Sequence, residues 1–190
     1  KLSGQLCAAA IVIACGIRID NFNIPFFEGN IILSNAFSII LTMGWIVGIT
    51  NAINLIDGLD GLSTGIAIIS SVSLLIIFAL NGSPFIAIII ITALVGALSG
   101  FLPFNFNPAK TFIGDIGSNF VGFILAIVSI LGIAKTATAF VVVLPMIVLG
   151  LPIFDTVSAI VRRLIKGKSL KAVFQADKGH LHHKLIEKGF

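Results

Sequence analysis

Long runs of apolar residues without a single charge constrain this 190-residue chain more than any other feature. An α-helix needs about 20 such residues to cross the hydrocarbon core of a bilayer, and several runs approach or exceed that length. Only 11% of the residues are charged, against about 25% in an average soluble domain. Because a backbone in lipid has to satisfy its own hydrogen bonds, these runs are expected to be helical. The sequence therefore predicts an all-α, polytopic transmembrane helical bundle.

The predicted bundle has about six spans and forms a single integral-membrane domain over residues 1–190. The spans are Leu6–Ile17, Ile32–Ile49, Leu62–Leu80, Phe85–Phe101, Gly117–Ala134 and Thr138–Val161. The first of them is the shortest, and nothing beside it indicates a cleaved signal peptide. The chain opens at Lys1 without a methionine and stops at Phe190 just after a polar segment. We therefore expect it to be a piece of a longer protein, incomplete at both ends.

The distribution of basic residues predicts the orientation of the bundle. Eight of the twelve Lys and Arg residues follow the last predicted span, so residues 164–190 are expected to form a basic, histidine-containing loop in the cytoplasm. Counting spans backward places residues 50–61 and 102–116 and Lys1 on that same cytoplasmic face. Residues 18–30 and 81–84 and the link around Lys135 then face outward. The loops rich in Asp, Asn and His all fall on one side of a cell membrane.

This grouping of polar loops favours one class of function over another. A transporter would be expected to carry ionisable groups along a path through the membrane. Here the polar chemistry lies at the cytoplasmic surface, which fits a catalytic site that takes one substrate from the cytosol and a lipid from the bilayer. A transport module and a noncatalytic assembly subunit remain as alternatives, and nucleic-acid binding is not expected of a chain buried in lipid.

The stretch "NAINLIDGLDGLSTG" holds the first cluster of candidate site residues. Asn54, Asp57 and Asp60 are spaced by three, which on a helical turn places them on one face. The glycines between and after them allow a ligand to approach the backbone closely. Two neighbouring carboxylates repel unless a cation compensates them, and Mg²⁺ takes oxygen ligands of this kind. The alternative is a turn in which Asp and Asn cap helices, although capping accounts for only one Asp.

The stretch "FNFNPAKTFIGDIGS" holds the second cluster. Asp115 lies between glycines at the start of a predicted span, where a carboxylate can bind a ligand or cap the helix. Lys110 offers a positive charge for a phosphate, and Phe112 could stack on a base. Exposure of Lys110 and anchoring of Phe112 at the membrane interface are the alternatives for those two residues. Asp115 is the stronger candidate because the first acidic loop lies on the same face.

The third cluster is "DKGHLHHKL" in the basic tail. His180 and His183 share a helical face, with His182 on another. A zinc site is conceivable, but no thiolate accompanies the histidines and zinc has no evident task beside an oxygen-ligand site. The imidazoles could instead donate hydrogen bonds to a diphosphate. An exposed polar loop without a role is the alternative.

Four ordered motifs together resemble one family. They are "NAINLIDGLDGLSTG", "FNFNPAKTFIGDIGSNFVGF", "PIFDTVSAIVRRL" and "ADKGHLHHKLIEKGF". Their order and spacing resemble those of the polyprenyl-phosphate N-acetylhexosamine-1-phosphate transferases of glycosyltransferase family 4. That family includes enzymes that initiate teichoic acid and O-antigen and, more distantly, the phospho-N-acetylmuramoyl-pentapeptide transferases.

The resemblance implies a magnesium-dependent transfer of N-acetylhexosamine-1-phosphate from a UDP-sugar to undecaprenyl phosphate, with release of UMP. This reaction would initiate a cell-envelope glycopolymer. "GHLHH" resembles the N-acetylglucosamine branch more than the pentapeptide branch, which stays as an alternative. The expected partners are a UDP-N-acetylhexosamine, undecaprenyl or another polyprenyl phosphate and the lipid bilayer, with a homodimer left open.

The resemblance also implies roles for individual residues. The expected Mg²⁺ ligands are Asn54 and Asp115. The expected catalytic residues, including acidic residues of the cleft and histidines beside the diphosphate, are Asp57, Asp60, Asp115, His180, His182 and His183. The expected substrate-binding residues are Asn105, Lys110 and Phe112.

The chain departs from the family pattern at its beginning. Family members carry an adjacent Asp-Asp pair just upstream of the stretch that resembles "KLSGQ", and this chain begins at that Lys1. We therefore expect the isolated 190-residue chain to be inactive, and measurable turnover by it would refute this expectation.

Overall fold

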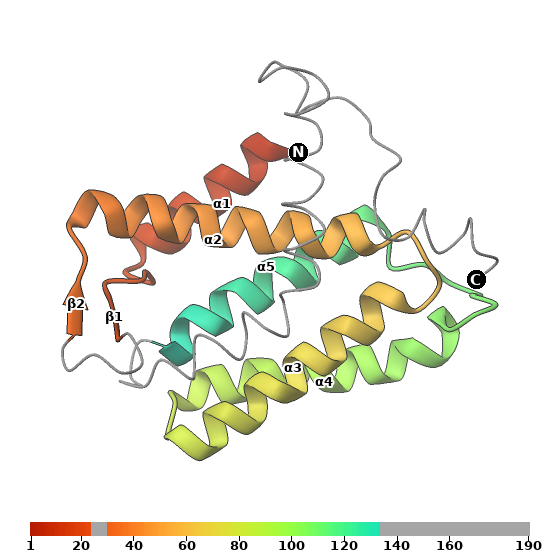
Figure 1. The fold of residues 1–190 in the computed structure, drawn as a ribbon. Helices are drawn as coiled ribbons and strands as arrows, with labels where there is room; N and C mark the ends of the chain where they lie inside the picture. The colour runs from red at the N-terminus through yellow and green to blue at the C-terminus, as the bar shows by residue number, and fades with distance from the viewer. Residues whose placement is uncertain (24–29, 134–190) are drawn as a thin grey trace.

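The computed structural model describes residues 1–23 and 30–133, and in these ranges the chain is mostly helical (Figure 1). The helices are α1 (Leu2–Ala14), α2 (Asn35–Ile56), α3 (Leu62–Asn81), α4 (Phe85–Asn105) and α5 (Gly114–Ile133). Four of them, α2 to α5, are long and apolar enough to cross a membrane. The predicted class, a polytopic transmembrane helical bundle, is therefore confirmed.

The expected number of spans is too high for the described residues. The predicted span Leu6–Ile17 is not among these four helices, since α1 has 13 described residues and ends at Ala14. Gly16 then adopts a φ of 82°, and its N–H donates to the carbonyl of Ile13. At about 1.5 Å per residue, α1 is shorter than the bilayer core of about 30 Å. The predicted span Thr138–Val161 lies outside the described residues.

Three of the spanning helices extend further than their apolar runs. The α2 helix continues past Ile49 to Ile56, and α4 continues past Phe101 to Asn105 with Pro103 inside it. The α5 helix begins at Gly114 rather than at Gly117. Because of these extensions, several polar residues expected in loops belong to the ends of helices, whose geometry is more rigid.

A short hairpin joins α1 to α2. Strands β1 (Asn21–Asn23) and β2 (Asn30–Ile32) pair antiparallel, with Asn21 opposite Ile32. Such a small hairpin is marginal by itself, and polar contacts fix its base to α2. The Asp20 carboxylate accepts a hydrogen bond from Ser38 Oγ at 3.0 Å and lies 2.8 Å from Arg18 Nε.

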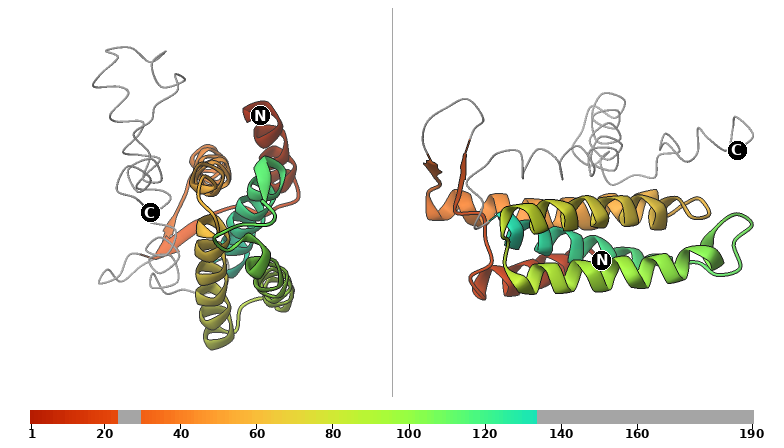
Figure 2. Two further views of the ribbon diagram at one scale, coloured as in Figure 1. Left: turned by 90° about the vertical axis from the view of Figure 1, so that its right-hand side faces the viewer. Right: turned by 90° about the horizontal axis from the view of Figure 1, so that it is seen from below.

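The α5 helix lies at the centre of the described bundle. It contacts α2, α3 and α4, while α3 and α4 run antiparallel side by side (Figures 1 and 2). The approach of α5 to α2 is close at Gly122. A Cβ at that position would lie 2.9 Å from Thr50 Cα and 3.2 Å from the Ile49 carbonyl oxygen. A small residue here lets two backbones touch, as is common between helices in membranes.

The polar loops fall at one end of the bundle, as predicted. The α2–α3 loop and the α4–α5 loop lie together at that end, whereas the hairpin and the α3–α4 turn lie at the other (Figure 1). The grouping of residues 50–61 with 102–116, away from 18–30 and 81–84, is thus confirmed for the described residues. That this end faces the cytoplasm stays a prediction.

Replacing Gly122 with Ala tests the close approach of α2 and α5. Gly→Ala inside a helix ordinarily stabilises by about 0.5–1 kcal/mol, but here the new Cβ would meet backbone atoms. We expect Gly122→Ala to lower the free energy of unfolding by about 1–3 kcal/mol, measured by denaturant titration in detergent. Gly96→Ala on α4 is the matched control, because a Cβ there meets no atom within 4 Å. Equal effects of the two substitutions would contradict the packing.

Candidate functional site

The first part of the site joins α2 and α5. Asn54 lies in the last turn of α2, and its Nδ2 donates to Asp115 Oδ1 at 2.9 Å and to Ser118 Oγ at 2.8 Å. Asp115 lies in the first turn of α5, and its side chain is 83% exposed. The two residues expected to bind Mg²⁺ are therefore neighbours, although they are 61 positions apart in the sequence.

A lysine from α1's N-terminal end joins this pair. Lys1 Nζ donates to Asn54 Oδ1 and lies 4.0 Å from Asp115 Oδ1. Its positive charge is thus close to the two oxygens that would hold a metal. Sequence reasoning missed Lys1 and Ser118 as members of the site. For Ser118 a signal was present, because it follows Asp115 by three residues and so shares its helical face.

The residues around Asn54 and Asp115 fit a magnesium ion. One exposed carboxylate and one amide oxygen supply hard oxygen donors, and Mg²⁺ commonly takes one or two protein ligands with water and substrate phosphates completing its shell. Within residues 1–23 and 30–133, no three or more His, Cys, Asp or Glu side chains are arranged so that they could hold a metal ion together. A metal at this position would therefore depend on a phosphate or water for most of its ligands.

Asp57 lies at the end of α2 and is half-buried. Ser63 Oγ donates to its Oδ1 at 2.5 Å. Burial raises the pKa of Asp57 above the ordinary aspartate value, the Ser63 hydrogen bond opposes this rise, and repulsion from Asp115 adds to it. The carboxylates of Asp57 and Asp115 are thus close enough to interact, and a cation between them would relieve the repulsion.

Asp60 connects the two loops at this end of the bundle. Its Oδ2 accepts hydrogen bonds from Asn107 Nδ2 at 3.3 Å and from the backbone N–H of Ala109 at 3.0 Å. A pocket of about 730 Å³ surrounds this junction. Its lining comprises residues 58–62 of the α2–α3 loop and Gly65, Ile66, Ile69, Phe106 and Asn107. Asn107 and Phe106 were missed by sequence reasoning because nothing in the local pattern singles them out.

The three predicted substrate-binding residues differ in their surroundings. Asn105 is buried, and both ends of its amide are engaged: Oδ1 accepts from Thr64 Oγ1 at 2.6 Å and Nδ2 donates to the Thr111 carbonyl at 3.0 Å. Asn105 thus anchors the α4–α5 loop to α3. Lys110 and Phe112 are exposed on that loop, where either can meet a ligand. His180, His182 and His183 lie outside the described residues.

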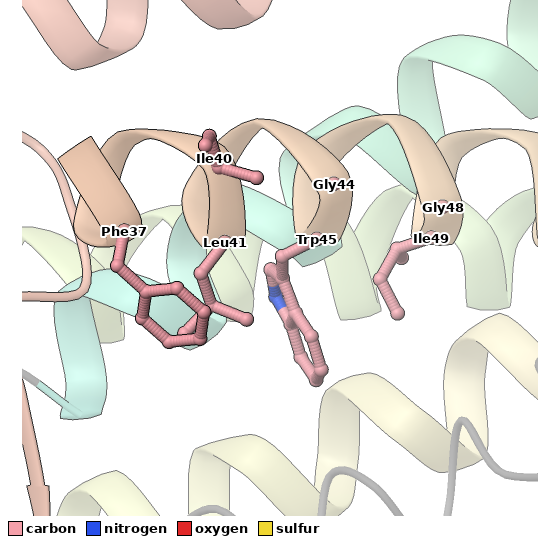
Figure 3. A pocket seen from close by; sticks show the side chains of 7 residues that line it. All are labelled: Phe37, Ile40, Leu41, Gly44, Trp45, Gly48 and Ile49. Carbon is pink, nitrogen blue, oxygen red and sulfur yellow. The ribbon is translucent and has the colours of Figure 1, made fainter.

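An apolar groove runs along one face of α2. It has a volume of about 620 Å³ and is lined by Phe37, Ile40, Leu41, Gly44, Trp45, Gly48 and Ile49 (Figure 3). Gly44 and Gly48 are one turn apart, and a Cβ at either position would meet no atom within 4 Å. The groove therefore keeps open space beside the helix, and its Ile49 end lies toward the end of α2 that carries Asn54.

The raised pKa of Asp57 predicts a pH-dependent stability. The favourable contribution of its protonated form is fully present below the ordinary aspartate pKa and is lost as the pH rises through the raised value. Asp57→Asn, which cannot ionise, should therefore unfold at a higher temperature than the unmodified protein near neutral pH. The difference should shrink as the pH falls to about 4. Thermal unfolding in detergent with EDTA measures it.

Ser63→Ala gives the complementary test. Removing the hydrogen bond that lowers the pKa of Asp57 should make the loss of stability with rising pH steeper. A stability difference between Asp57→Asn and the unmodified protein that does not change with pH would refute the account.

Comparisons with known proteins agree on one family. The model of the family described as Glycosyl transferase family 4 matches residues 1–133. A Bacillus subtilis protein named probable undecaprenyl-phosphate N-acetylglucosaminyl 1-phosphate transferase is 43% identical over 185 residues, which cover 97% of this chain and 50% of that protein. A Mycobacterium leprae decaprenyl-phosphate N-acetylglucosaminephosphotransferase is 36% identical over 209 residues, which cover 100% of this chain and 52% of that protein.

A third relative is named as a pentapeptide transferase. A Staphylococcus haemolyticus phospho-N-acetylmuramoyl-pentapeptide-transferase is 48% identical over 111 residues, which cover 58% of this chain and 34% of that protein. The chain spans about half the length of the first two relatives. The family match covers most of the chain, including the first two of the four motifs, and it agrees with the multi-pass helical bundle. The chain belongs to glycosyl transferase family 4.

Proposed function

We propose that this chain carries the core of an active site that transfers N-acetylglucosamine-1-phosphate from UDP-N-acetylglucosamine to undecaprenyl phosphate, releasing UMP. The reaction would start a cell-envelope glycopolymer at the cytoplasmic face of the cell membrane. The observation that carries the proposal is the meeting of Asn54, Asp57 and Asp115 at the end of the bundle that also holds the Asp60 pocket. The names of the B. subtilis and M. leprae relatives support the acceptor and the sugar.

Mg²⁺ is the proposed cofactor, with Asp115 Oδ and Asn54 Oδ1 as its protein ligands. When bound there, the ion would neutralise negative charge on the donor diphosphate. Asn54 Nδ2 holds the Asp115 carboxylate in place, and Ser118 supports Asn54 from the next turn of α5. The Lys1 ammonium adds a second positive charge beside the same oxygens, where it can contact a transferring phosphate.

The donor is proposed to enter through the Asp60 pocket. Its volume of about 730 Å³ is within the usual range of about 300–1,000 Å³ for small-molecule sites. Asp60 can accept hydrogen bonds from the N–H of a base or from the hydroxyl groups of a ribose, while exposed Lys110 and Phe112 border the approach on the α4–α5 loop. The predicted histidines would act on the diphosphate from the far end of the chain.

The acceptor chain is proposed to lie in the apolar groove of α2. Its lining offers a polyprenyl chain a surface without charged groups, and the groove points toward the helix end that carries Asn54. A lipid phosphate at that end would come close to the donor diphosphate. This layout lets a water-soluble nucleotide sugar and a membrane-bound lipid react at one junction.

A pentapeptide-carrying donor is the second candidate. The S. haemolyticus relative supports it through 48% identity, but that match covers only 58% of this chain. The matches to the N-acetylglucosamine transferases cover 97% and 100% of it. The longer coverage favours UDP-N-acetylglucosamine.

Replacing Asp115 tests the proposed reaction. The protein expressed from its whole gene is purified and assayed with undecaprenyl phosphate, UDP-N-acetylglucosamine and Mg²⁺. In this assay Asp115→Asn should lower the rate of UMP release by about 100-fold or more, because it removes the charge of a metal ligand. EDTA should abolish the activity of the unmodified protein. Asp20→Asn, the same substitution at the opposite end of the bundle, is the control and should leave the rate nearly unchanged. Unaltered turnover in Asp115→Asn would contradict the proposal.

Filling the α2 groove tests the acceptor site. Gly48→Leu should raise the KM for undecaprenyl phosphate by about three- to tenfold, a modest change because a chain leaving lipid for a protein groove gains packing rather than burial from water. The KM for UDP-N-acetylglucosamine should stay the same. Gly96→Leu on α4 is the matched control, since that position is also open. Equal effects of Gly48→Leu and Gly96→Leu would place the acceptor elsewhere.

A further inference from the structure

Three side-chain amides form a cluster that the proposed reaction does not use. Gln5 of α1, Asn51 of α2 and Asn119 of α5 are all half-buried. Gln5 Nε2 donates to Asn119 Oδ1 at 2.7 Å and to Asn51 Oδ1 at 3.3 Å. Asn51 Nδ2 donates back to Gln5 Oε1 at 2.8 Å. We call these three residues the amide layer.

The amide layer lies one helical turn from the site on each of its three helices. Asn51 precedes Asn54 by three residues, Asn119 follows Asp115 by four, and Gln5 follows Lys1 by four. Residues three or four apart share a helical face. Asn119 Nδ2 also donates to the Asp115 carbonyl oxygen, and Asn51 Nδ2 to that of Val47. The layer thus continues directly into the Lys1–Asn54–Asp115 cluster.

Within residues 1–23 and 30–133, few apolar side chains of α1 fix the helix against the bundle. Only Ala9 and Val12 of its 13 residues are buried. Two such small side chains leave the rotation of the N-terminal turns of α1 weakly specified, because the polar contacts of Arg18, Ile19 and Asp20 with α2 lie beyond the other end of the helix. An unpaired amide in an apolar bundle is costly, and hydrogen bonds between membrane helices stabilise their association. The directional bonds of Gln5 therefore define the register of α1 better than its apolar contacts do.

We propose that Gln5 is a positioning residue that fixes α1 so that the Lys1 ammonium lies beside Asn54 and Asp115. The inference rests on the proposed function for its effect on catalysis, but its structural part does not. Gln5 acts through Lys1 and not on the substrates. Its loss should therefore reduce kcat while leaving the KM of both substrates nearly unchanged.

A double-mutant cycle with Lys1 tests the proposal in the natively expressed protein. Gln5→Met keeps the length of the side chain and removes its hydrogen bonds. We expect Gln5→Met to lower kcat by about five- to twentyfold in the unmodified protein. In a Lys1→Met background, Gln5→Met should not lower kcat any further. A merely structural role would produce the same fold loss in both backgrounds, and that outcome would overturn the proposal.

A distance measurement separates this proposal from the proposed function. Spin labels at the exposed native Cys7 of α1 and at Phe120→Cys of α5, with Cys15 changed to Ser, report how α1 sits against α5. The distribution of distances between the two labels should be narrow in the protein with Gln5, and broader or shifted in Gln5→Met. If Gln5→Met does not fold, Asn119→Val, which breaks one bond of Gln5, gives the same test. A distance distribution that is the same with and without Gln5 would overturn this proposal, whatever the enzyme's activity. If the distribution depends on Gln5 but the unmodified protein has no transferase activity, only the proposed function is refuted.

Discussion

The close contact between α2 and α5 is the feature on which the rest of the described structure depends. In lipid, apolar side chains gain little by meeting one another, so helices associate through packing and hydrogen bonds. Gly122 lets the two backbones touch near Thr50, and Trp45 Nε1 donates to Ser129 Oγ at 3.0 Å along the same interface. This contact sets the register in which the last turn of α2 meets the first turn of α5. Asn54 and Asp115 meet because of that register.

Polar groups gather where the membrane tolerates them. The exposed Asp115 carboxylate lies at the end of the bundle, and deeper polar side chains such as Thr64 and Asn105 are bonded to one another. Between these two zones, Asp57 is half-buried with a raised pKa. The exposure of the polar groups thus decreases from the end of the bundle inward. The charged side chains lie at the surface, and the helices below them fix their positions. This arrangement suits a reaction between a soluble donor and a lipid acceptor.

Sequence reasoning predicted the class of the fold and the end at which the acidic residues gather. Four predicted spans overlap spanning helices because length and composition alone decide whether a segment can cross lipid. The start predicted at Ile32 is wrong, because Ile32 pairs in β2 and α2 begins at Asn35. The sequence-based prediction was wrong where contacts between helices determine the end of a helix. The α2 helix ends at Ile56 rather than at Ile49, because Asn51 and Asn54 form hydrogen bonds with residues of α1 and α5. Lys1 and Gln5 gave no local signal, since their roles arise only when α1 meets two helices distant in sequence. Asn105 has an anchoring contact that no motif spacing could reveal.

The central claim is that Asn54 and Asp115 hold the divalent cation to which the donor diphosphate binds. Electron paramagnetic resonance of Mn²⁺ substituted for Mg²⁺, with UDP-N-acetylglucosamine present, tests it most directly. We expect ³¹P hyperfine coupling from the diphosphate in the unmodified protein and its loss in both Asn54→Leu and Asp115→Asn. A coupled Mn²⁺ signal that persists unchanged in both variants would contradict the account.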